Sequence, residues 1–274
     1  MHAWTHANAR ATAGGIYRDC FIEATSLVHI DENGLFAASD TDPANNRSVA
    51  HPITHVINTN SKHVKNVHVT FAIYAPDGSL AAPVATSATG TIAAGTTFEF
   101  DATDAGIAVA SPSLWSIQSP ALYALVAAVF VDGKQVDTLE VVFGFRSATF
   151  SADSGFALNG NPVVLRGFSN HNDMVSTVPG RCYDSVPLYR GGGSVAGLWC
   201  SHVVPYALTI RTFFWFVCLL HVLHLQAGVG AAVPQRLNLF RAQMLRGVGA
   251  NIWRMSHNPG DPATFNLLDR LGIM

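Results

Sequence analysis

The sequence predicts a multi-domain protein of the β plus α/β class, in which an antiparallel β-sandwich precedes alternating strands and helices. From about Ile16 to Leu139, short segments with an apolar period of two are separated by turn residues, which is typical of a sandwich. After Arg146 strand-like and helix-like segments alternate, which favours parallel α/β packing. The 274 residues suffice for roughly two domains.

The strands of the first region follow from their alternation. Residues 67–73 place apolar side chains at every second position and are followed by the turn residues Pro76-Asp77-Gly78. Residues 16–23 are interpreted with the same period of two, with Ile16, Arg18, Cys20 and Ile22 on one face. Residues 125–131 and 135–142 are expected to form a hairpin, because Asp132-Gly133 between them favours a two-residue turn.

The second region begins with a hairpin that turns at Asn159-Gly160 and continues into a predicted strand, Val163–Leu165. Helical spacing of apolar residues predicts a helix at Asn238–Arg246, ended by Gly247. A short strand, Ala250–Met255, is expected to follow.

A second helix is predicted at Pro262–Leu271. Asp261 suits its N-cap, proline suits the first helical position, and Gly272 suits the end of the helix. These local signals predict both boundaries of the helix.

Composition excludes several classes of protein. Aromatic residues (10%) and hydrophobic residues (49%) supply ample surface to bury, so the chain is not disordered. The net charge is −2 and the basic residues form no stripe, which argues against a nucleic-acid partner. The four cysteines lack the spacing of a metal site or a disulfide framework, and no cofactor is expected. The first residues lack the apolar core of a signal peptide, and the compartment stays open.

Residues 175–227 fit neither neighbouring region and are interpreted as an insertion. The apolar run Phe213–Leu225 is broken only by His221 and His224, and it is shorter than the roughly 20 residues of a membrane helix. A membrane anchor is therefore an alternative that we do not favour. A metal site at the two histidines is favoured less, because no carboxylate lies near them in sequence.

Six segments carry recognisable motifs, among them the sequences FGFR and FALNGNPVVLRG. They are Gly14–Asp19, Leu114–Tyr123, Phe143–Arg146, Phe156–Gly167, Trp253–Pro259 and Asp261–Gly272. In this order they resemble motifs of glycoside hydrolase family 2, which includes β-galactosidases, β-glucuronidases and β-mannosidases. The resemblance covers residues 14–174 and 228–274.

The resemblance implies three domains. Residues 1–27 would be the last strands of a jelly-roll sugar-binding domain, residues 28–147 an immunoglobulin-like β-sandwich, and residues 148–274 the first βα units of an incomplete TIM barrel. The chain would then be truncated at both ends. The insertion at 175–227 would derive from an intron, which is a hypothesis.

The resemblance also implies retaining hydrolysis of a terminal β-glycosidic bond by two glutamates. All four glutamates of the chain precede the barrel region; they are Glu23, Glu32, Glu99 and Glu140. No catalytic residue is therefore assigned, and the chain alone is expected to be inactive.

By resemblance, five residues would contact the β-glycoside substrate; they are His171, Asp173, Arg254, His257 and Asn258. The alternatives are a loop histidine that holds backbone at 257 and a buried, ion-paired arginine at 254. The sugar is open, although the motif wording leans towards β-galactosidases. A non-catalytic β-sandwich module that binds carbohydrate or protein is the alternative function. No oligomeric state is predicted, and a membrane partner is not expected.

Overall fold

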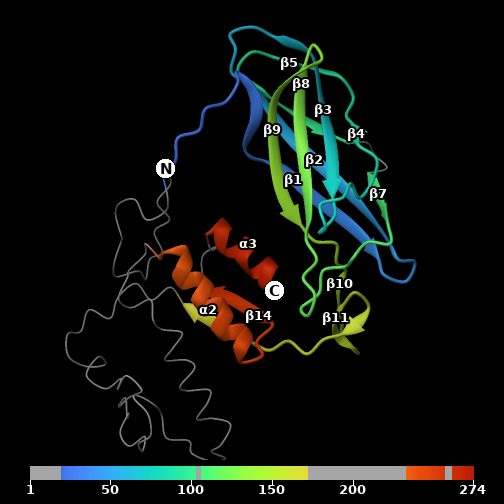
Figure 1. The fold of residues 1–274 in the computed structure, drawn as a ribbon, viewed down its shortest axis with the longest axis vertical. Helices are drawn as coiled ribbons and strands as arrows, with labels where there is room; N and C mark the ends of the chain where they lie inside the picture. The colour runs from blue at the N-terminus through green and yellow to red at the C-terminus, as the bar shows by residue number, and fades with distance from the viewer. Residues whose placement is uncertain (1–19, 103–105, 172–232, 257–260) are drawn as a thin grey trace, which may run out of the picture. The chain divides into compact units, whose positions relative to one another are not determined.

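The computed structural model describes residues 20–102, 106–171, 233–256 and 261–274 (Figure 1). By their contacts, residues Cys20–Phe168, Asn238–Arg254 and Gly260–Met274 form one compact unit. The remaining residues form a second unit, most of which lies outside the described ranges. The features below belong to the first unit, apart from the described residues 169–171, 233–237 and 255–256.

Two antiparallel sheets form a β-sandwich. One sheet has the order β1-β2-β6, with β7 also paired to β2, and the other has the order β4-β3-β8-β9, with β5 also paired to β3. The strands are β1 (Val28–Asp42), β2 (Arg47–Asn58), β3 (Val64–Tyr74), β4 (Ala85–Thr86), β5 (Gly90–Ile92), β6 (Thr97–Asp101), β7 (Ile107–Ala110), β8 (Tyr123–Val131) and β9 (Lys134–Phe143).

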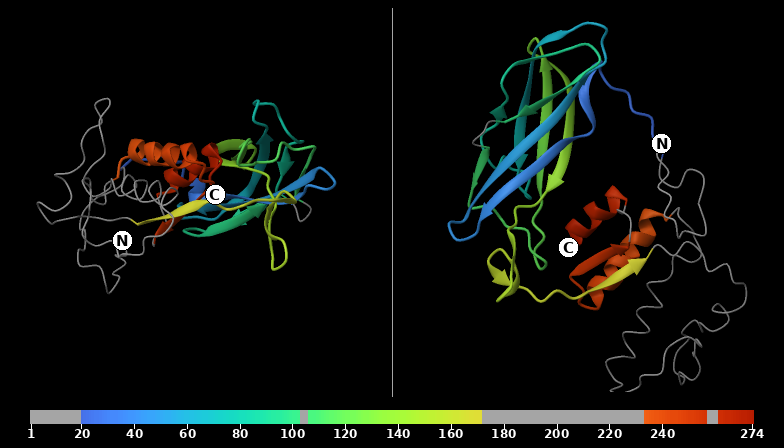
Figure 2. Two further views of the ribbon diagram at one scale, coloured as in Figure 1. Left: turned by 90° about the horizontal axis from the view of Figure 1, so that it is seen from below. Right: turned by 180° about the vertical axis from the view of Figure 1, so that it is seen from behind.

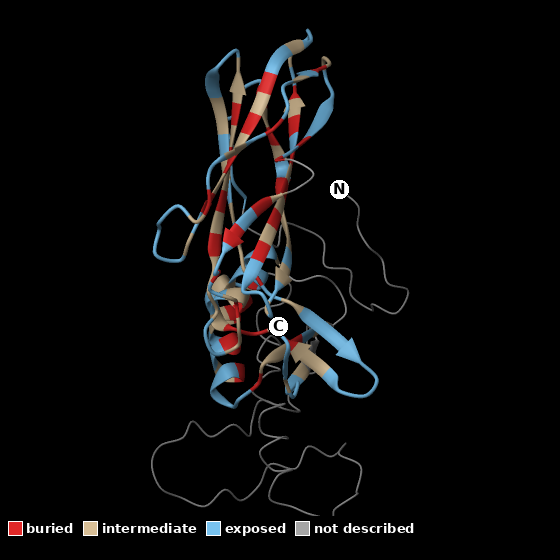
Figure 3. Ribbon diagram, turned by 90° about the vertical axis from the view of Figure 1, so that its right-hand side faces the viewer, coloured by how far each residue is buried: buried red, intermediate tan, exposed pale blue. Residues whose placement is uncertain are grey.

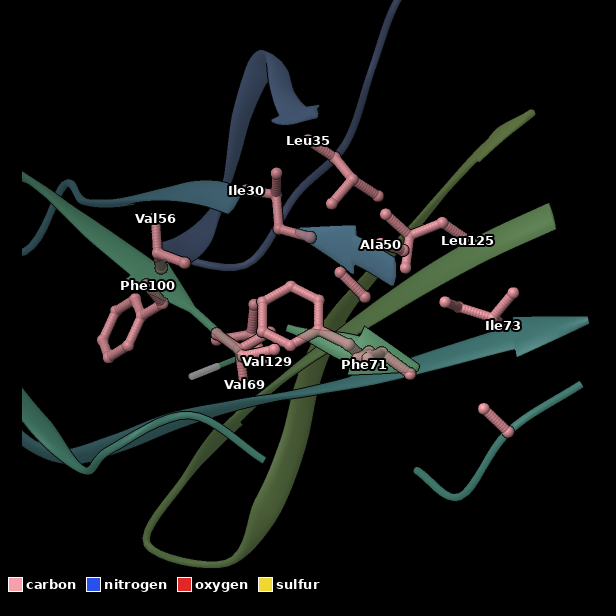
Figure 4. Packing of buried hydrophobic residues seen from close by; sticks show 14 of the residues in the cluster. Ile30, Leu35, Ala50, Val56, Val69, Phe71, Ile73, Phe100, Leu125 and Val129 are labelled. Atoms are coloured by element: carbon pink, nitrogen blue, oxygen red, sulfur yellow. The ribbon is translucent and has the colours of Figure 1, made fainter. Parts of the chain in front are cut away.

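The core lies between the two sheets, and buried residues alternate with less buried ones along β2, β3 and β8 (Figure 3). On the adjacent strands β3 and β8, Val69 is paired with Val129 and Phe71 is paired with Ala127. All four residues are fully buried. Figure 4 shows side chains of both sheets meeting there, with Ile30, Val56 and Phe100 opposite Phe71 and Val129. The predicted sandwich and the predicted strand 67–73 are confirmed.

The predicted hairpin between β8 and β9 is also confirmed. Asp132 and Gly133 both have positive φ, 48° and 77°, as a two-residue turn of type I′ requires. Asparagine and aspartate tolerate this conformation better than other residues with a Cβ, which explains the Asp-Gly pair.

Two sequence-based expectations for strands are wrong. Within the predicted strand 16–23, the described residues Cys20–Glu23 are irregular and exposed, and residues 16–19 lie outside the described ranges. The predicted strand Val163–Leu165 is also irregular, because the backbone leaves β12 after one bond from Val163 N to the Phe156 carbonyl. The apolar run there is not buried, since Val164 is largely exposed.

The strands that flank this irregular segment are short. A three-stranded sheet consists of β10 (Ala148–Ser151), β11 (Gly155–Leu158) and β12 (Asn161–Pro162). Its predicted turn is confirmed, since Asn159 and Gly160 have φ of 52° and 77°. Strand β13 (Gly167–His171) follows and pairs with β14 (Ile252–Ser256).

The predicted helices and the strand between them are present (Figure 2). Helix α2 spans Gln235–Gly247, three residues longer at its start than predicted, and α3 spans Pro262–Leu271 as predicted. Asp261 accepts a bond from Ala263 N at the start of α3, and Gly272 at its end has φ of 67°. We call residues 235–254 and 261–274 the α/β segment.

Candidate functional site

Of the five predicted substrate-binding residues, the structure describes the side chain of Arg254 alone. Arg254 lies on β14 and is exposed, so its alternative as a buried arginine is wrong. His171 is the last residue of β13, the strand that pairs with β14. Asp173, His257 and Asn258 lie outside the described ranges, although the last two follow β14 closely in sequence.

Strand β14 is held on both sides by backbone hydrogen bonds. Asn251 N donates to the Arg166 carbonyl (2.8 Å), and the Asn251 side chain bonds the backbone at Arg166 and Val164. On the other side, Met274 N donates to the Asn251 carbonyl (2.9 Å) and Trp253 N donates to the Met274 carbonyl (2.8 Å). Met274 thus bonds the residues on either side of Ile252, which lies opposite it. This is the hydrogen-bond pattern of parallel strands.

The buried face of β14 carries Trp253, which contacts a buried arginine on α2. The guanidinium carbon of Arg241 lies 5.5 Å from the centre of the Trp253 ring, within cation–π range. Burial lowers the pKa of Arg241 to about 10, which leaves the side chain charged at neutral pH. A polar contact also joins helix α2 to helix α3, since Asn238 Nδ2 donates to Thr264 Oγ1 (2.9 Å).

Sequence reasoning missed a cluster around Trp115, although four of the six motifs contribute to it. The indole Nε1 donates to the Asp269 carbonyl of α3 (2.8 Å), and the guanidinium of Arg146 lies 4.8 Å from the ring centre. Asn159 Nδ2 donates to the Trp115 carbonyl (3.0 Å). The motifs are separated by up to 154 residues, so no local pattern could have indicated this contact.

Burial raises the pKa of the Asp269 carboxyl above its ordinary value, while the positive charge of Arg146 acts in the opposite direction. Asp269 lines a cavity of about 190 Å³ together with Glu140, Asn266, Arg270 and three apolar residues of the sandwich. The cavity is shallow and holds no polar group that is itself deeply buried.

The described part of the α/β segment contains no glutamate. Glu32, Glu99 and Glu140 belong to the sandwich, and Glu99 Oε2 lies 3.0 Å from His55 Nε2 on its outer face. Among the described residues no group of three histidine, cysteine or acidic side chains could hold a metal ion. A catalytic pair of glutamates is therefore missing from the residues that the structure places in α2, β14 and α3.

No helix within the described ranges is long and apolar enough to cross a membrane. The run Phe213–Leu225, with His221 and His224, and the whole predicted insertion 175–227 lie outside those ranges. The disfavoured alternative of a membrane anchor and the hypothesis of an intron-derived insertion are therefore untested.

Curated relatives match nearly the whole chain. A β-glucuronidase of Formosa agariphila is 22% identical over 99% of this chain, and the β-galactosidase BoGH2A of Bacteroides ovatus is 25% identical over 97% of it. The chain spans about a quarter of the length of both proteins, 23% and 25%.

Solved structures share the fold. A β-glucuronidase of Bacteroides uniformis, covalently bound to cyclophellitol-6-carboxylate aziridine, superposes with a TM-score of 0.67. It is 23% identical, and the match covers 95% of this chain and 25% of that one. A family 2 glycosyl hydrolase of Bacteroides cellulosilyticus gives a TM-score of 0.64 at 24% identity, with 91% and 26% covered.

The family model described as glycosyl hydrolases family 2 matches residues 28–146, which are the sandwich and the FGFR motif that follows it. The matched segment is thus the part of the chain that forms the two-sheet core. With the relatives above, this match confirms the resemblance to glycoside hydrolase family 2 found in the sequence.

Proposed function

We propose that this chain contributes the glycoside-recognising start of a retaining β-glycosidase, and that the polypeptide alone does not turn substrate over. The observation that carries the proposal is the position of Arg254. It is the central residue of β14, two residues before the carboxyl end of that strand, in a strand–helix–strand–helix arrangement. The carboxyl ends of the strands are where α/β barrels gather their substrate-binding residues.

The parallel ladder supports an interpretation of β13, β14 and Met274 as the first strands of a TIM barrel. Each of the last two begins after a helix, α2 or α3, as in the βα repeat of that fold. In this proposal residues 148–274 form the first barrel units, and His257 and Asn258 follow β14 into the loop that faces the substrate.

The immunoglobulin-like character of residues 28–147 is part of the same proposal. Sheets β1-β2-β6 and β3-β8-β9 follow the order of the two immunoglobulin sheets. Tyr123 at the start of β8 accepts a bond from Ser113 N (2.8 Å) through its hydroxyl, like the tyrosine corner of that fold. Residues 1–27 would belong to a preceding jelly-roll domain, as the sequence predicts.

The relatives are named for β-glucuronides and β-galactosides, and we propose a terminal β-glycoside of one of these two classes as the ligand. A retaining reaction needs two carboxyl groups about 5 Å apart, one as nucleophile and one as acid/base. The resemblance implies glutamate for both roles, and residues 148–274 contain no glutamate, so we expect binding without hydrolysis.

Saturation-transfer NMR on the full chain with methyl β-D-glucuronide and methyl β-D-galactoside tests this proposal. We expect transfer to one of the two sugars, reduced several-fold by Arg254→Ala and by His257→Ala. Arg47→Ala and His55→Ala are matched controls, because both side chains are exposed on the sandwich. Equal transfer to all four variants, or transfer to neither sugar, would contradict it.

A further inference from the structure

Trp115 is fixed on every side within the first unit. Its indole is 1% exposed, its backbone N donates to the Phe145 carbonyl (2.8 Å), and its carbonyl accepts from Asn159 Nδ2. A Cβ at Gly144 would lie 2.8 Å from the Trp115 Cβ, so this residue must be glycine for the indole to sit there. Arg146 covers the ring.

The indole reaches the last turn of α3. Its Nε1 donates to the Asp269 carbonyl, one of the terminal carbonyls that have no partner within a helix. The same carbonyl accepts the N–H of Gly272, which closes the helix in a left-handed conformation. A Cβ at Gly272 would overlap the Ile117 carbonyl oxygen, so residues 115 and 117 together fix the end of α3.

The two residues that follow this end connect it to β14. Ile273 is 1% exposed, and Met274 makes both backbone bonds to Asn251 and Trp253. The distance along the chain from Asp269 to Met274 is short, so a shift of the helix end moves the partner of β14 directly. Arg254 is the next residue on that strand.

We propose that Trp115 is a positioning residue for β14, acting through the Asp269 carbonyl, Gly272 and Met274. In this way the sandwich sets the place of the strand that carries Arg254. The consequence for sugar binding rests on the function proposed above, whereas the mechanical coupling does not.

Trp115→Phe tests the coupling, because phenylalanine keeps an aromatic face for Arg146 and loses the N–H donor. Amide hydrogen exchange of the full chain, followed by NMR, should be about 3- to 10-fold faster at Trp253 and Met274, as expected for one lost hydrogen bond. Exchange at Phe71 and Val129 in the sandwich core should not change.

Tyr123→Phe is the matched control, since it removes one hydrogen bond, to Ser113 N, that lies wholly in the sandwich. It should not accelerate exchange at Trp253 or Met274 beyond any change in the core. Equal acceleration by both variants, or equal acceleration of core and β14 by Trp115→Phe, would overturn the positioning role, because a merely structural role moves all amides alike.

A second measurement uses the unmodified chain, so it can be made even if Trp115→Phe does not fold. The Trp115 indole N–H should exchange with protection within about tenfold of the Trp253 and Met274 amides, since one opening exposes all three. An indole N–H that exchanges 100-fold faster than both amides would overturn the proposal. Trp253 Nε1, which has no hydrogen-bond partner among the described residues, identifies the signal of an unbonded buried indole.

The sugar experiment separates the two proposals. With Trp115→Phe, saturation transfer to the sugar bound by the unmodified chain should fall several-fold. Faster exchange at β14 with unchanged sugar binding would retain the coupling and contradict its functional consequence. If the unmodified chain binds neither methyl β-D-glucuronide nor methyl β-D-galactoside, the proposed function fails while the exchange result stands.

Discussion

The β-sandwich and the α/β segment differ in how they bury their side chains. The sandwich encloses a core of twenty buried residues contributed by both sheets. The α/β segment buries nine side chains, among them the charged Arg241 and the polar Asn238 and Thr264. The end of α3 also contacts Trp115 and Ile117, which precede β8 in the chain. The core of the sandwich is therefore made of its own residues, whereas the end of α3 rests on residues that precede β8.

This comparison predicts its largest effect at the centre of the sandwich. Phe71→Ala should lower the free energy of unfolding by about 3–5 kcal/mol, because it opens a cavity in a fully buried core. Urea unfolding followed by circular dichroism measures the change. Phe150→Ala, at a phenylalanine that is 77% exposed, is the control and should change stability little. A similar effect of the two substitutions would contradict the packed core.

A smaller loss is expected at Asn58, where a buried amide joins two segments of the sandwich, at Lys62 and at Ile92-Ala93. Its Nδ2 lies within hydrogen-bond distance of the carbonyls of Lys62, Ile92 and Ala93, so Asn58→Ala leaves acceptors unpaired and should cost about 2–3 kcal/mol. Thermal unfolding checks this, with the exposed Asn45→Ala as control. A loss below that of Asn45→Ala would refute the role assigned to the amide.

In the α/β segment, Gly272 and Gly249 form a matched pair. Both have positive φ, but a Cβ has open space at Gly249 and overlaps the Ile117 carbonyl at Gly272. Gly249→Ala should cost about 1 kcal/mol and Gly272→Ala about 2–3 kcal/mol, measured by exchange at the α3 amides. Equal costs would mean that α3 does not rest on the sandwich.

The smallest effect concerns Asp269, whose pKa is raised in the folded protein by burial. The native state then binds a proton more tightly than the unfolded state, so this group favours folding below pH 3.8 and loses that contribution as pH rises through its folded pKa. Asp269→Asn should remove this dependence. The free energy of unfolding of the variant minus that of the unmodified chain should therefore be slightly larger at pH 7 than at pH 4. Urea unfolding at the two pH values measures it, and an unchanged difference would contradict the raised pKa.

Local signals explain which elements the sequence predicts. Asp261, Pro262 and Gly272 each act on their own backbone, and α3 has the predicted bounds. Strand β1 escapes such reasoning, because its register shifts between Ile30 and Leu35 and interrupts the period of two. The strand predicted at residues 163–165 is wrong for a different reason. An apolar run does not reveal whether a partner strand lies beside it.

The candidate site also has one feature that local sequence predicts and one that only the folded chain shows. The position of Arg254 on a strand follows from neighbouring residues, and the structure has it there. The contact between Trp115 and Asp269 joins residues 154 positions apart, and only the folded chain brings them together. The family motifs mark both partners, yet they do not reveal that the two meet.

The central claim, recognition of a β-glycoside without turnover, is tested most directly by an assay of the purified chain. Nitrophenolate release from p-nitrophenyl β-D-glucuronide and p-nitrophenyl β-D-galactoside should equal that of buffer, because residues 148–274 hold no glutamate. Release above buffer that His257→Ala abolishes would contradict the account, since it would require a catalytic pair among residues to which none is assigned.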